Sequence, residues 1–317
     1  MMNMKKRMLT LAALLLAIPA AGFAANIDFV TAGTSSTFYP ISATVVSLWN
    51  EQIEGMRAVA TPSGGGIDNL NQAYDGDAQI GIANVNLVYQ AQEGLAAFEG
   101  YENENLRIFA GLYLNPNQIV VTKESGIGSI GDMAGRRISV GAPGSSTIDE
   151  AMAHLALCGL TLEDVKGEYM GTGESADAMA NRQLDGVWVM AGTPNAAVTQ
   201  IMTTMDARLL PVSEEEVLKL QEAYPWYAPY TIPAGTYAGQ DEDVLTSAVK
   251  LTLFITADVD EETVYQMTKV FWENWDMLTE MHAALAKADP KAACSDIAGV
   301  ALHAGAARYY REIGLIQ

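Results

Sequence analysis

The sequence predicts an α/β protein made of two similar halves, each with a glycine-and-hydroxyl turn between a strand and a helix. Short apolar strands alternate with amphipathic helices from Ile27 onward, which favours a layered α/β fold. The stretch Gly33–Pro40 (GTSSTFYP) follows an apolar run and precedes a helical pattern. A similar stretch, Gly141–Thr147 (GAPGSST), follows a strand predicted over Arg137–Val140.

The spacing of later landmarks supports this two-half interpretation. In each half an aspartate in a later turn lies 44 positions after the glycine that opens the glycine-and-hydroxyl turn: Asp77 follows Gly33, and Asp185 follows Gly141. Asn84 and Gly192 both lie 51 positions after that glycine. With 28 glycines in the chain one such match could be chance, but here the order of elements and the spacing agree together.

Hydrophobic periodicity and turn residues define the remaining elements. In the first half they predict a helix after the glycine turn Pro62–Gly66, a strand over Gln79–Ala83, and strands over Leu106–Tyr113 and Ile119–Thr122 with a break at Asn115–Asn117. In the second half they predict a helix from Ile148, a strand over Glu168–Met170, a turn at Gly171–Gly173, a helix over Ala176–Ala180 and a strand over Val187–Met190.

The last third of the chain is less symmetric. It is predicted to contain a strand over Leu209–Val212, an acidic helix over Glu214–Glu222, an aromatic loop over Tyr224–Tyr230, a strand over Val249–Thr256 and a long helix over Val264–Met281. We expect Leu251–Ile255 to re-enter the first half, because its counterpart in the second half is Ile119–Thr122. The chain would then cross between the halves near residues 114–118 and 236–248, as a hinge requires.

The first residues resemble a targeting segment. Lys5, Lys6 and Arg7 precede the apolar run Met8–Ile18, and small residues around Ala24 offer a cleavage point. This pattern predicts a secretory signal peptide over residues 1–24, with a permanent N-terminal anchor as the alternative. No later stretch is long and apolar enough to cross a bilayer, so we expect a periplasmic protein.

Charge restricts the partners of this chain. The formal net charge is −20, and it becomes −23 when the three basic residues of the predicted signal peptide are removed. Such a surface repels phosphates, so no nucleic-acid partner is expected. An anionic ligand would need a locally positive pocket. The free N–H groups of a helix N-terminus provide one without a basic side chain, although the same hydroxyl residues could simply cap their helices.

The sequence shows no pattern typical of catalysis or metal binding. The three histidines, His154, His282 and His303, have no spacing that would place two on one metal, so neither a metal nor a cofactor is expected. Gly171–Ala176 fits a loose dinucleotide fingerprint, but Glu174 would face the pyrophosphate, which favours a simple glycine turn.

Two further groups of residues leave alternatives open. The only cysteines, Cys158 and Cys294, could pair after export or stand as two small buried hydrophobic residues. Four arginines near predicted strand ends or helix faces could clamp a carboxylate, although solvation at the surface is favoured for each: Arg107, Arg136, Arg137 and Arg182.

In their order, several motifs resemble those of the TAXI-type substrate-binding proteins of TRAP transporters. The motifs are GTSSTFYP, SGGGIDNL, SVGAPGSST, LLPV, IPAGTY and LHAGAARYYREIGL. This resemblance implies a two-lobe type II periplasmic-binding-protein fold with a hinge and an interlobe cleft. It also implies a non-enzymatic monomer that binds a small carboxylate such as glutamate or 2-oxoglutarate. The protein would deliver this ligand to a TRAP-type membrane permease.

The resemblance also implies which residues contact the ligand: Thr34, Ser35, Thr37, Tyr39 and Asn84 in the first lobe, and Ser145, Ser146, Thr147, Gly192 and Thr193 in the second. The implied domains are residues 25–115 with 240–317 as lobe 1 and residues 116–239 as lobe 2.

The sequence departs from the family at two places, and both bear on ligand choice. The turn Gly33–Pro40 is shorter and poorer in glycine than the usual family turn, and Asn84-Val85-Asn86 replaces a more usual Gln-Ser-Asp. Two rival functions are an enzyme of the same shape, for which the sequence offers no base, and a periplasmic ligand sensor that serves a signalling receptor.

Overall fold

The computed structural model describes residues 25–34 and 36–317, so the predicted signal peptide and Ser35 lie outside the described residues. Strands of the described part form one sheet path in the order β2-β1-β3-β10-β4-β7-β5-β6, with β8 paired to β4 and β9 to β10. This order is symmetric about the central pair β10-β4. The predicted α/β class and the two halves of equal internal order are confirmed.

Residues 25–115 and 240–317 are called lobe 1, and residues 116–239 lobe 2, a division that we propose from the sequence. The elements of lobe 1 are β1 (Ala25–Val30), α1 (Phe38–Gln52), β2 (Met56–Thr61), α2 (Gly66–Asp75), β3 (Ile80–Asn84), α3 (Val85–Glu93), most of β4 (Leu106–Thr122), β10 (Val244–Thr256), α8 (Glu261–Glu273), α9 (Trp275–Met281) and α10 (Ala304–Glu312). Those of lobe 2 are the end of β4, β5 (Arg137–Ser139), α4 (Ser146–Leu157), β6 (Lys166–Glu168), α5 (Thr172–Ala180), β7 (Gly186–Met190), α6 (Ala196–Thr204), β8 (Ala207–Leu210), α7 (Glu214–Ala223) and β9 (Tyr227–Ile232).

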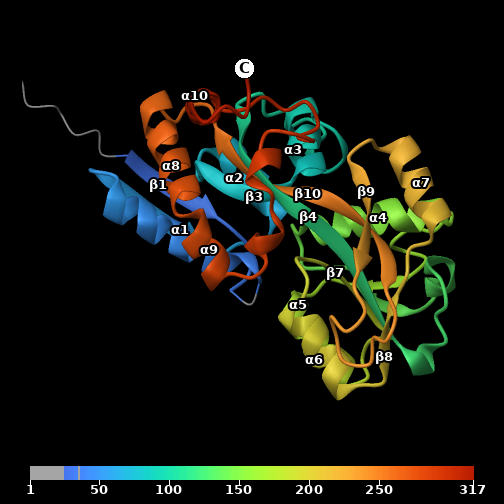
Figure 1. Ribbon diagram of the computed structural model, residues 1–317. Coiled ribbons are helices and arrows are strands. Elements are labelled where there is room, and N and C mark those ends of the chain that lie inside the picture. The colour runs from blue at the N-terminus through green and yellow to red at the C-terminus, as the bar shows by residue number, and fades with distance from the viewer. Residues whose placement is uncertain (1–24, 35) are drawn as a thin grey trace, which may run out of the picture.

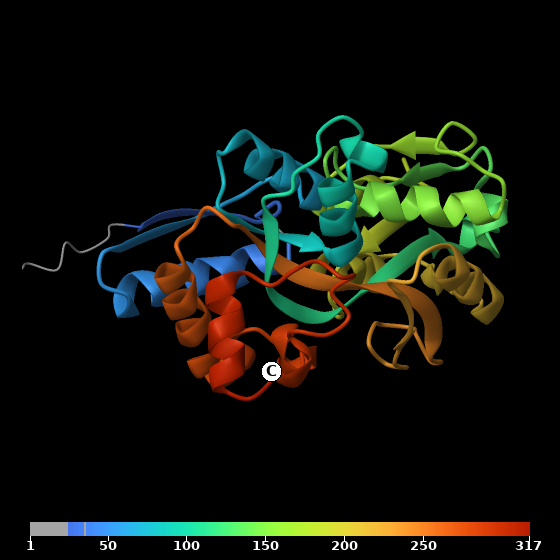
Figure 2. The same cartoon turned by 90° about the horizontal axis from the view of Figure 1, so that it is seen from above.

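Helices cover both faces of the sheet in lobe 1. Successive strand residues point to opposite faces, so Phe29 packs with α1, α8 and α10 while Val30 packs with α2 and α3. Figure 2 shows α8–α10 on the side of the sheet opposite α2 and α3. Helix α1 is fixed by Trp49, which is fully buried and donates its indole N–H to the Met267 carbonyl of α8 at 3.0 Å.

Lobe 2 repeats this arrangement. Val120 of β4 packs with α5 and α6, whereas its neighbour Val121 packs with α4 and α7. The N-terminus of α7 carries a capping box, in which Ser213 accepts from the Glu216 N–H and Glu216 accepts from the Ser213 N–H. Each lobe is therefore a separate three-layer unit with its own core (Figure 1).

The two lobes share the antiparallel pair β4–β10. Strand β4 pairs with β10 up to Pro116 and gains β7 as a neighbour from Asn117. The break predicted at Asn115–Asn117 is therefore wrong, because the φ of proline suits an extended strand and its missing N–H falls where β4 changes partner. The predicted re-entry of Leu251–Ile255 into lobe 1 is confirmed by its pairing with β3.

Two other predicted elements differ in the structure. The long helix over Val264–Met281 is divided at Asn274, whose side-chain amide donates to the Val270 carbonyl and ends α8. The aromatic segment predicted as a loop contains strand β9, which pairs with β10 over Tyr227–Ile232. Its aromatic side chains favour a strand, but the sequence alone does not show that β10 pairs with this edge segment, so the segment was predicted as a loop.

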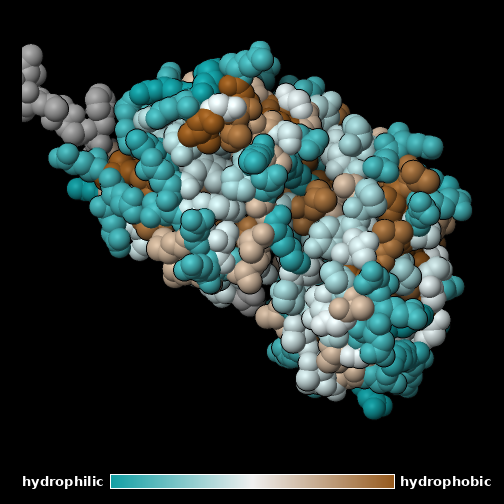
Figure 3. Space-filling model, viewed as in Figure 1, coloured by the Kyte–Doolittle hydropathy of each residue, from teal (hydrophilic) through white to brown (hydrophobic). Residues whose placement is uncertain are grey.

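The outer surface is mostly hydrophilic on the face shown in Figure 3, with a few separate hydrophobic patches. Within the described residues, no helix is long and apolar enough to span a membrane. The fold therefore consists of two lobes joined by a shared pair of strands (Figure 1).

The cysteines are not bridged in the structure, and this is testable by thiol titration. Cys158 is exposed and Cys294 is partly buried, and burial raises the pKa of the Cys294 thiol to about 11. We expect two titratable thiols in the unfolded protein, of which one reacts quickly and one slowly when the protein is folded. Absence of free thiols under denaturing, non-reducing conditions would show that the two residues pair.

Candidate functional site

A cavity of about 180 Å³ lies between the lobes at the carboxyl ends of their parallel strands. Ala32 and Gly33 follow β1, and Asn84 ends β3 on the lobe 1 side. Gly141 and Met190 stand at the corresponding positions after β5 and in β7 of lobe 2. The two glycine-and-hydroxyl turns predicted from the sequence thus face each other across one cavity, where ligands of open α/β sheets bind.

Six helices of the described part of the chain begin at this cavity. Their first residues or N-caps line it: Thr37 for α1, Gly65 and Gly66 for α2, Asn84 for α3, Ser145 and Ser146 for α4, Gly171 and Thr172 for α5, and Asn195 for α6. Each N-terminus contributes about half a positive charge from its helix dipole. Their convergence favours an anion in the cavity although the whole chain is acidic.

The cavity has no charged side chain among its described lining residues, which are all glycine, hydroxyl, amide or apolar. The arginines that the sequence offered as carboxylate clamps are not among them. Arg137, for example, forms an ion pair with Asp185 at 2.7 Å instead. An anion in this cavity would be held by neutral donors alone, an arrangement that favours recognition by hydrogen-bond geometry.

The six termini differ in how far their donors are already used. Glu174 accepts from the Gly171 N–H at the start of α5, and the Asn195 side chain accepts from two N–H groups of α6. No side chain caps α4, and the buried Ser145 hydroxyl has no partner within the described structure. Helices α2 and α3 also have no side-chain cap, but the unpaired Ser145 hydroxyl gives the α4 N-terminus an additional polar group for a ligand.

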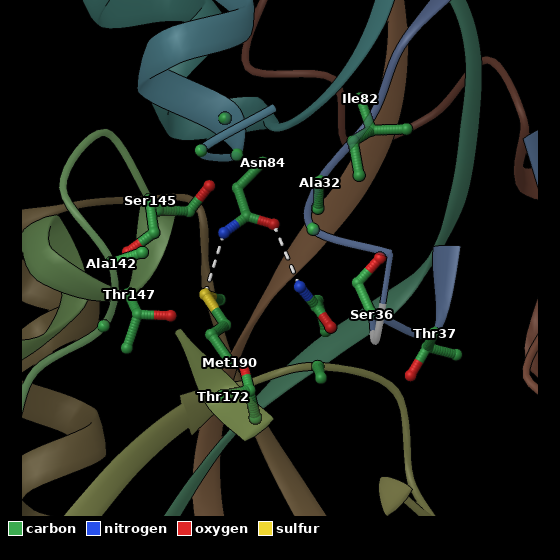
Figure 4. Close-up of a pocket in the computed structure, with 18 of the residues that line it drawn as sticks. Ala32, Ser36, Thr37, Ile82, Asn84, Ala142, Ser145, Thr147, Thr172 and Met190 are labelled. Atoms are coloured by element: carbon green, nitrogen blue, oxygen red, sulfur yellow. Dashed lines mark hydrogen bonds between the residues drawn. The ribbon is translucent and has the colours of Figure 1, made fainter. Parts of the chain in front are cut away.

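Asn84 connects the two lobes at the floor of the cavity. Its side chain is fully buried and points from β3 of lobe 1 toward Met190 of lobe 2, with the amide nitrogen 2.8 Å from the sulfur (Figure 4). Its amide oxygen accepts from the Asn115 side chain at 3.3 Å. The Asn115 oxygen is itself buried without a partner among the described residues, so a ligand donor could complete this network.

The lobes meet closely beside the cavity at the Gly64–Gly66 turn. The Asp68 N–H of α2 donates to the Gly144 carbonyl of lobe 2 at 3.0 Å. A Cβ on Gly64 would stand 2.6 Å from the Pro143 carbonyl oxygen, closer than real contacts allow. The structure therefore shows the lobes in contact, and the absence of a side chain on Gly64 permits that contact.

The structure places the predicted contact residues in three groups. Lining the cavity are Thr37, Asn84, Ser145, Ser146 and Thr147. Four others are not among the lining residues: Thr34 is exposed, Tyr39 stands within α1, Gly192 packs against the Tyr113 ring, and Thr193 is buried beside Tyr230 and Lys287. Ser35 lies outside the described residues.

Several lining residues were not among the predicted contacts, namely Gly64–Gly66, Asn115, Gly171, Thr172, Met190 and Asn195. The internal repeat could have identified two sets of these residues, Gly64–Gly66 and Gly171 with Thr172. Gly64 lies 31 positions after Gly33, and Gly171 lies 30 positions after Gly141, so the second glycine turns of the two halves correspond. Asn115 and Asn195 have no such signal, because they reach the cavity only through tertiary packing.

No cluster of three or more His, Cys, Asp or Glu side chains that could hold a metal occurs in the described part of the chain. The three histidines lie apart from the cavity lining. The cavity therefore offers donors, dipoles and shape for binding, and its described side chains include no acid or base.

Comparison with known proteins places the chain among proteins of this architecture. A model of the NMT1-like family matches residues 29–314. A protein from Bordetella bronchiseptica RB50 is similar in structure, with a TM-score of 0.59, 15% identity, and coverage of 91% of this chain and 98% of that chain. A structure from work on glutathione import by GshT and the cystine importer TcyBC of Streptococcus mutans has a TM-score of 0.53 and 13% identity, covering 83% of this chain and 97% of that one.

A structure described as a periplasmic transporter has a TM-score of 0.52 and 10% identity, and it covers 91% of this chain and 92% of that chain. At these identities the similarity concerns the fold. The two-lobe type II periplasmic-binding-protein fold expected from the sequence is confirmed.

Contact between the lobes can be tested with a pair of glycine variants. Gly64→Ala places a methyl group against the Pro143 carbonyl, so it should prevent the hydrogen bond from the Asp68 N–H to Gly144. We expect amide exchange at Asp68 to become faster by about tenfold, as loss of one hydrogen bond of about 1.4 kcal/mol predicts. Gly33→Ala is the matched control, because a Cβ there meets nothing within 4 Å. Equal exchange in both variants would contradict the proposed contact.

Proposed function

This chain belongs to the NMT1-like family, and on that premise we propose that it is an extracytoplasmic solute-binding protein that captures a small carboxylate between its lobes. The single observation that carries this proposal is the convergence of six helix N-termini on an interlobe cavity without a charged lining side chain. Such a cavity attracts negative charge through N–H groups and dipoles. Its described lining includes neither a catalytic base nor a nucleophile with a base, which favours binding over catalysis.

The size of the cavity favours a small ligand. At about 180 Å³ it is smaller than the pockets that hold drug-sized molecules, which measure roughly 300–1,000 Å³. A carboxylate of glutamate or 2-oxoglutarate size suits this space better than a peptide or an oligosaccharide. We propose that Ser145, Ser146 and Thr147 bind its carboxylate at the α4 N-terminus, and that Thr37 and Asn84 bind it from lobe 1.

Binding and lobe closure would be one event. A ligand that contacts the α4 terminus and Asn84 together bridges both lobes, so it stabilises the closed form by its greater affinity for that form. Motion would occur around the crossing strands β4 and β10. The closed surface would then be recognised by a membrane permease, for which the sequence motifs favour a TRAP-type partner. The protein would act as a periplasmic monomer after removal of residues 1–24.

A ligand sensor for a signalling receptor is the second candidate, because closure could equally be recognised by a receptor ectodomain. Affinity purification from membranes separates the two. Recovery of a multi-span permease supports transport, and recovery of a histidine-kinase ectodomain supports sensing.

A thermal-shift screen tests the ligand class. Dialysed protein is heated with C4–C6 dicarboxylates, amino acids or sugars, and the melting temperature is measured. A cognate carboxylate at one hundred times its dissociation constant should stabilise the folded protein by about 2.7 kcal/mol. Gly64→Ala should lose most of this stabilisation. Gly131→Ala should keep it, because Gly131 is exposed, does not line the cavity, and an added Cβ there meets no atom nearer than 3.7 Å. If only sugars or metal ions raise the melting temperature, the carboxylate proposal is overturned.

A further inference from the structure

Two neighbouring carboxyl groups lie buried directly behind the cavity. Asp149 and Glu150 stand on α4, whose first residues line the cavity. Asp149 is 8% exposed and Glu150 is 0% exposed. Since an α-helix has 3.6 residues per turn, the pair begins about one turn beyond the predicted anion contacts.

The hydrogen-bond partners of this pair are neutral and come partly from the other lobe. The Asn86 side-chain nitrogen of α3 lies 2.9 Å from an Asp149 oxygen and 3.4 Å from a Glu150 oxygen. Asn117 of β4 donates to the second Glu150 oxygen at 2.9 Å, and the Tyr227 hydroxyl of β9 also bonds to Glu150. Because Asn86 belongs to lobe 1 and the pair to lobe 2, contact between the lobes covers these carboxyl groups.

No positive charge faces the pair from the described elements packed around it. From α3 it meets Asn86 and the neutral Gln90. His154, further along α4, bonds to the Glu150 carbonyl and to Ser247, and burial lowers its pKa to about 4, so it is uncharged near pH 7.

The remaining titratable groups nearby are acidic or uncharged. Burial raises the pKa of the Tyr227 hydroxyl well above its usual value, and α7 contributes Glu216, which acts on His154. Two carboxyl groups without a counter-cation are costly to keep ionised in such surroundings.

Protonation relieves this cost. Burial and the neighbouring Asp149 charge raise the pKa of Glu150 to about 8, and burial raises the pKa of Asp149 to about 6. The pair in this closed arrangement therefore holds about one proton near pH 7. Separation of the lobes would remove Asn86 and Gln90 from the pair, and entry of water there would lower both pKa values toward the ordinary range near 4.

The Asn86 side chain can form hydrogen bonds with the Asp149 and Glu150 carboxyl groups in both their ionised and their protonated states. Its side-chain oxygen is buried without a partner within the described structure. A half-turn of the amide exchanges its nitrogen for this oxygen, which then accepts a hydrogen bond from a protonated carboxyl group. A lysine or arginine at this position would instead keep the carboxylates ionised.

We propose that Asp149 and Glu150 form a proton site that fills when the lobes close on an anionic ligand, so that capture of each anion takes up one proton from the solvent. One O–H bond forms on a carboxylate oxygen, and no electrons are transferred. Removal of negative charge behind the α4 N-terminus also reduces repulsion of the bound anion. This inference rests on the proposed function, because it requires an anionic ligand that closes the lobes.

The sign of the pH effect follows from the pKa direction. The closed state has the raised pKa values, so it binds more protons than the open state. Ligand affinity should therefore be highest at low pH and fall as the pH rises through 6 to 8. The fall should be about tenfold per pH unit between pH 6 and 8, where one proton is taken up, and steeper between about pH 4 and 6, where the closed pair holds two more protons than the open pair. It should level off above the higher pKa.

Isothermal titration calorimetry measures this proton directly. The mature protein is titrated with 2-oxoglutarate, and separately with L-glutamate, at pH 7 in bis-Tris and in Tris, amine buffers that differ in ionisation enthalpy and do not themselves present an anionic group to the site. We expect binding heats that differ between the buffers by an amount equal to about one proton per ligand. Glu150→Gln should bind with nearly equal heats in both buffers at pH 7 and should lose the pH dependence between pH 6 and 8, while the dependence from Asp149 below pH 6 remains. Glu163→Gln is the matched control, since it removes the same charge from an exposed position of lobe 2.

The measurement on the wild-type protein tests whether ligand binding takes up a proton even if Glu150→Gln folds poorly. Binding with buffer-independent heat and a flat pH profile overturns the proton site and leaves the proposed function intact. Failure of both 2-oxoglutarate and L-glutamate to bind at any pH removes the proposed function and this inference with it. Proton uptake that persists in a folded Glu150→Gln, Asp149→Asn double variant would also overturn the assignment to this pair.

Discussion

The shared pair of antiparallel strands, β4 and β10, is the constraint on which the rest of this structure depends. Both strands run from one lobe into the other, and their pairing extends from Thr256 with Leu106 to Ala248 with Pro116. The sheet order is symmetric about this pair, so the parallel strands of each lobe end toward the other lobe. The six helix N-termini that follow those strands must then converge on the space between the lobes.

This geometry explains how an acidic protein can have a site that favours an anion. The formal net charge is −20, yet the described lining of the cavity carries no charged side chain. Backbone N–H groups supply the positive potential, and their positions are fixed by the strands rather than by flexible side chains. Selectivity then depends on cavity shape and on polar groups such as Ser145 and Asn115, whose buried oxygens have no partner within the described structure.

Much of this fold could be predicted from the sequence because the chain repeats itself. The matching positions of Asp77 and Asp185 reflect two lobes with the same strand order, and glycine turns mark where helices begin. Continuity of β4 through Pro116 could not be predicted, because it depends on partners supplied by β10 and β7. Strand β9 escaped prediction for the same reason, since its pairing with β10 is a tertiary contact.

The candidate site was less predictable than the fold. Hydroxyl residues such as Thr37 and Ser145 follow strand ends in the sequence, the family resemblance implied them as contacts, and both line the cavity. Thr34 stands next to that pattern yet is exposed, because local pattern does not determine which way a turn residue faces. Asn115 lies in a segment predicted as a break and Asn195 follows the predicted contacts Gly192 and Thr193, but only the assembled lobes show that these two side chains line the cavity.

Helix α4 brings two opposing electrostatic requirements together. Its N-terminus stands at the cavity, where the dipole favours an anion, while Asp149 in its first turn also satisfies that dipole. Ionised, Asp149 and Glu150 would compete with a bound anion for the same positive potential. In water such competition would be weak, but burial of both side chains removes the screening that would weaken it. A neutral amide partner, Asn86, leaves protonation as the way to reduce this charge, which is why the proton site and the anion site belong to one mechanism.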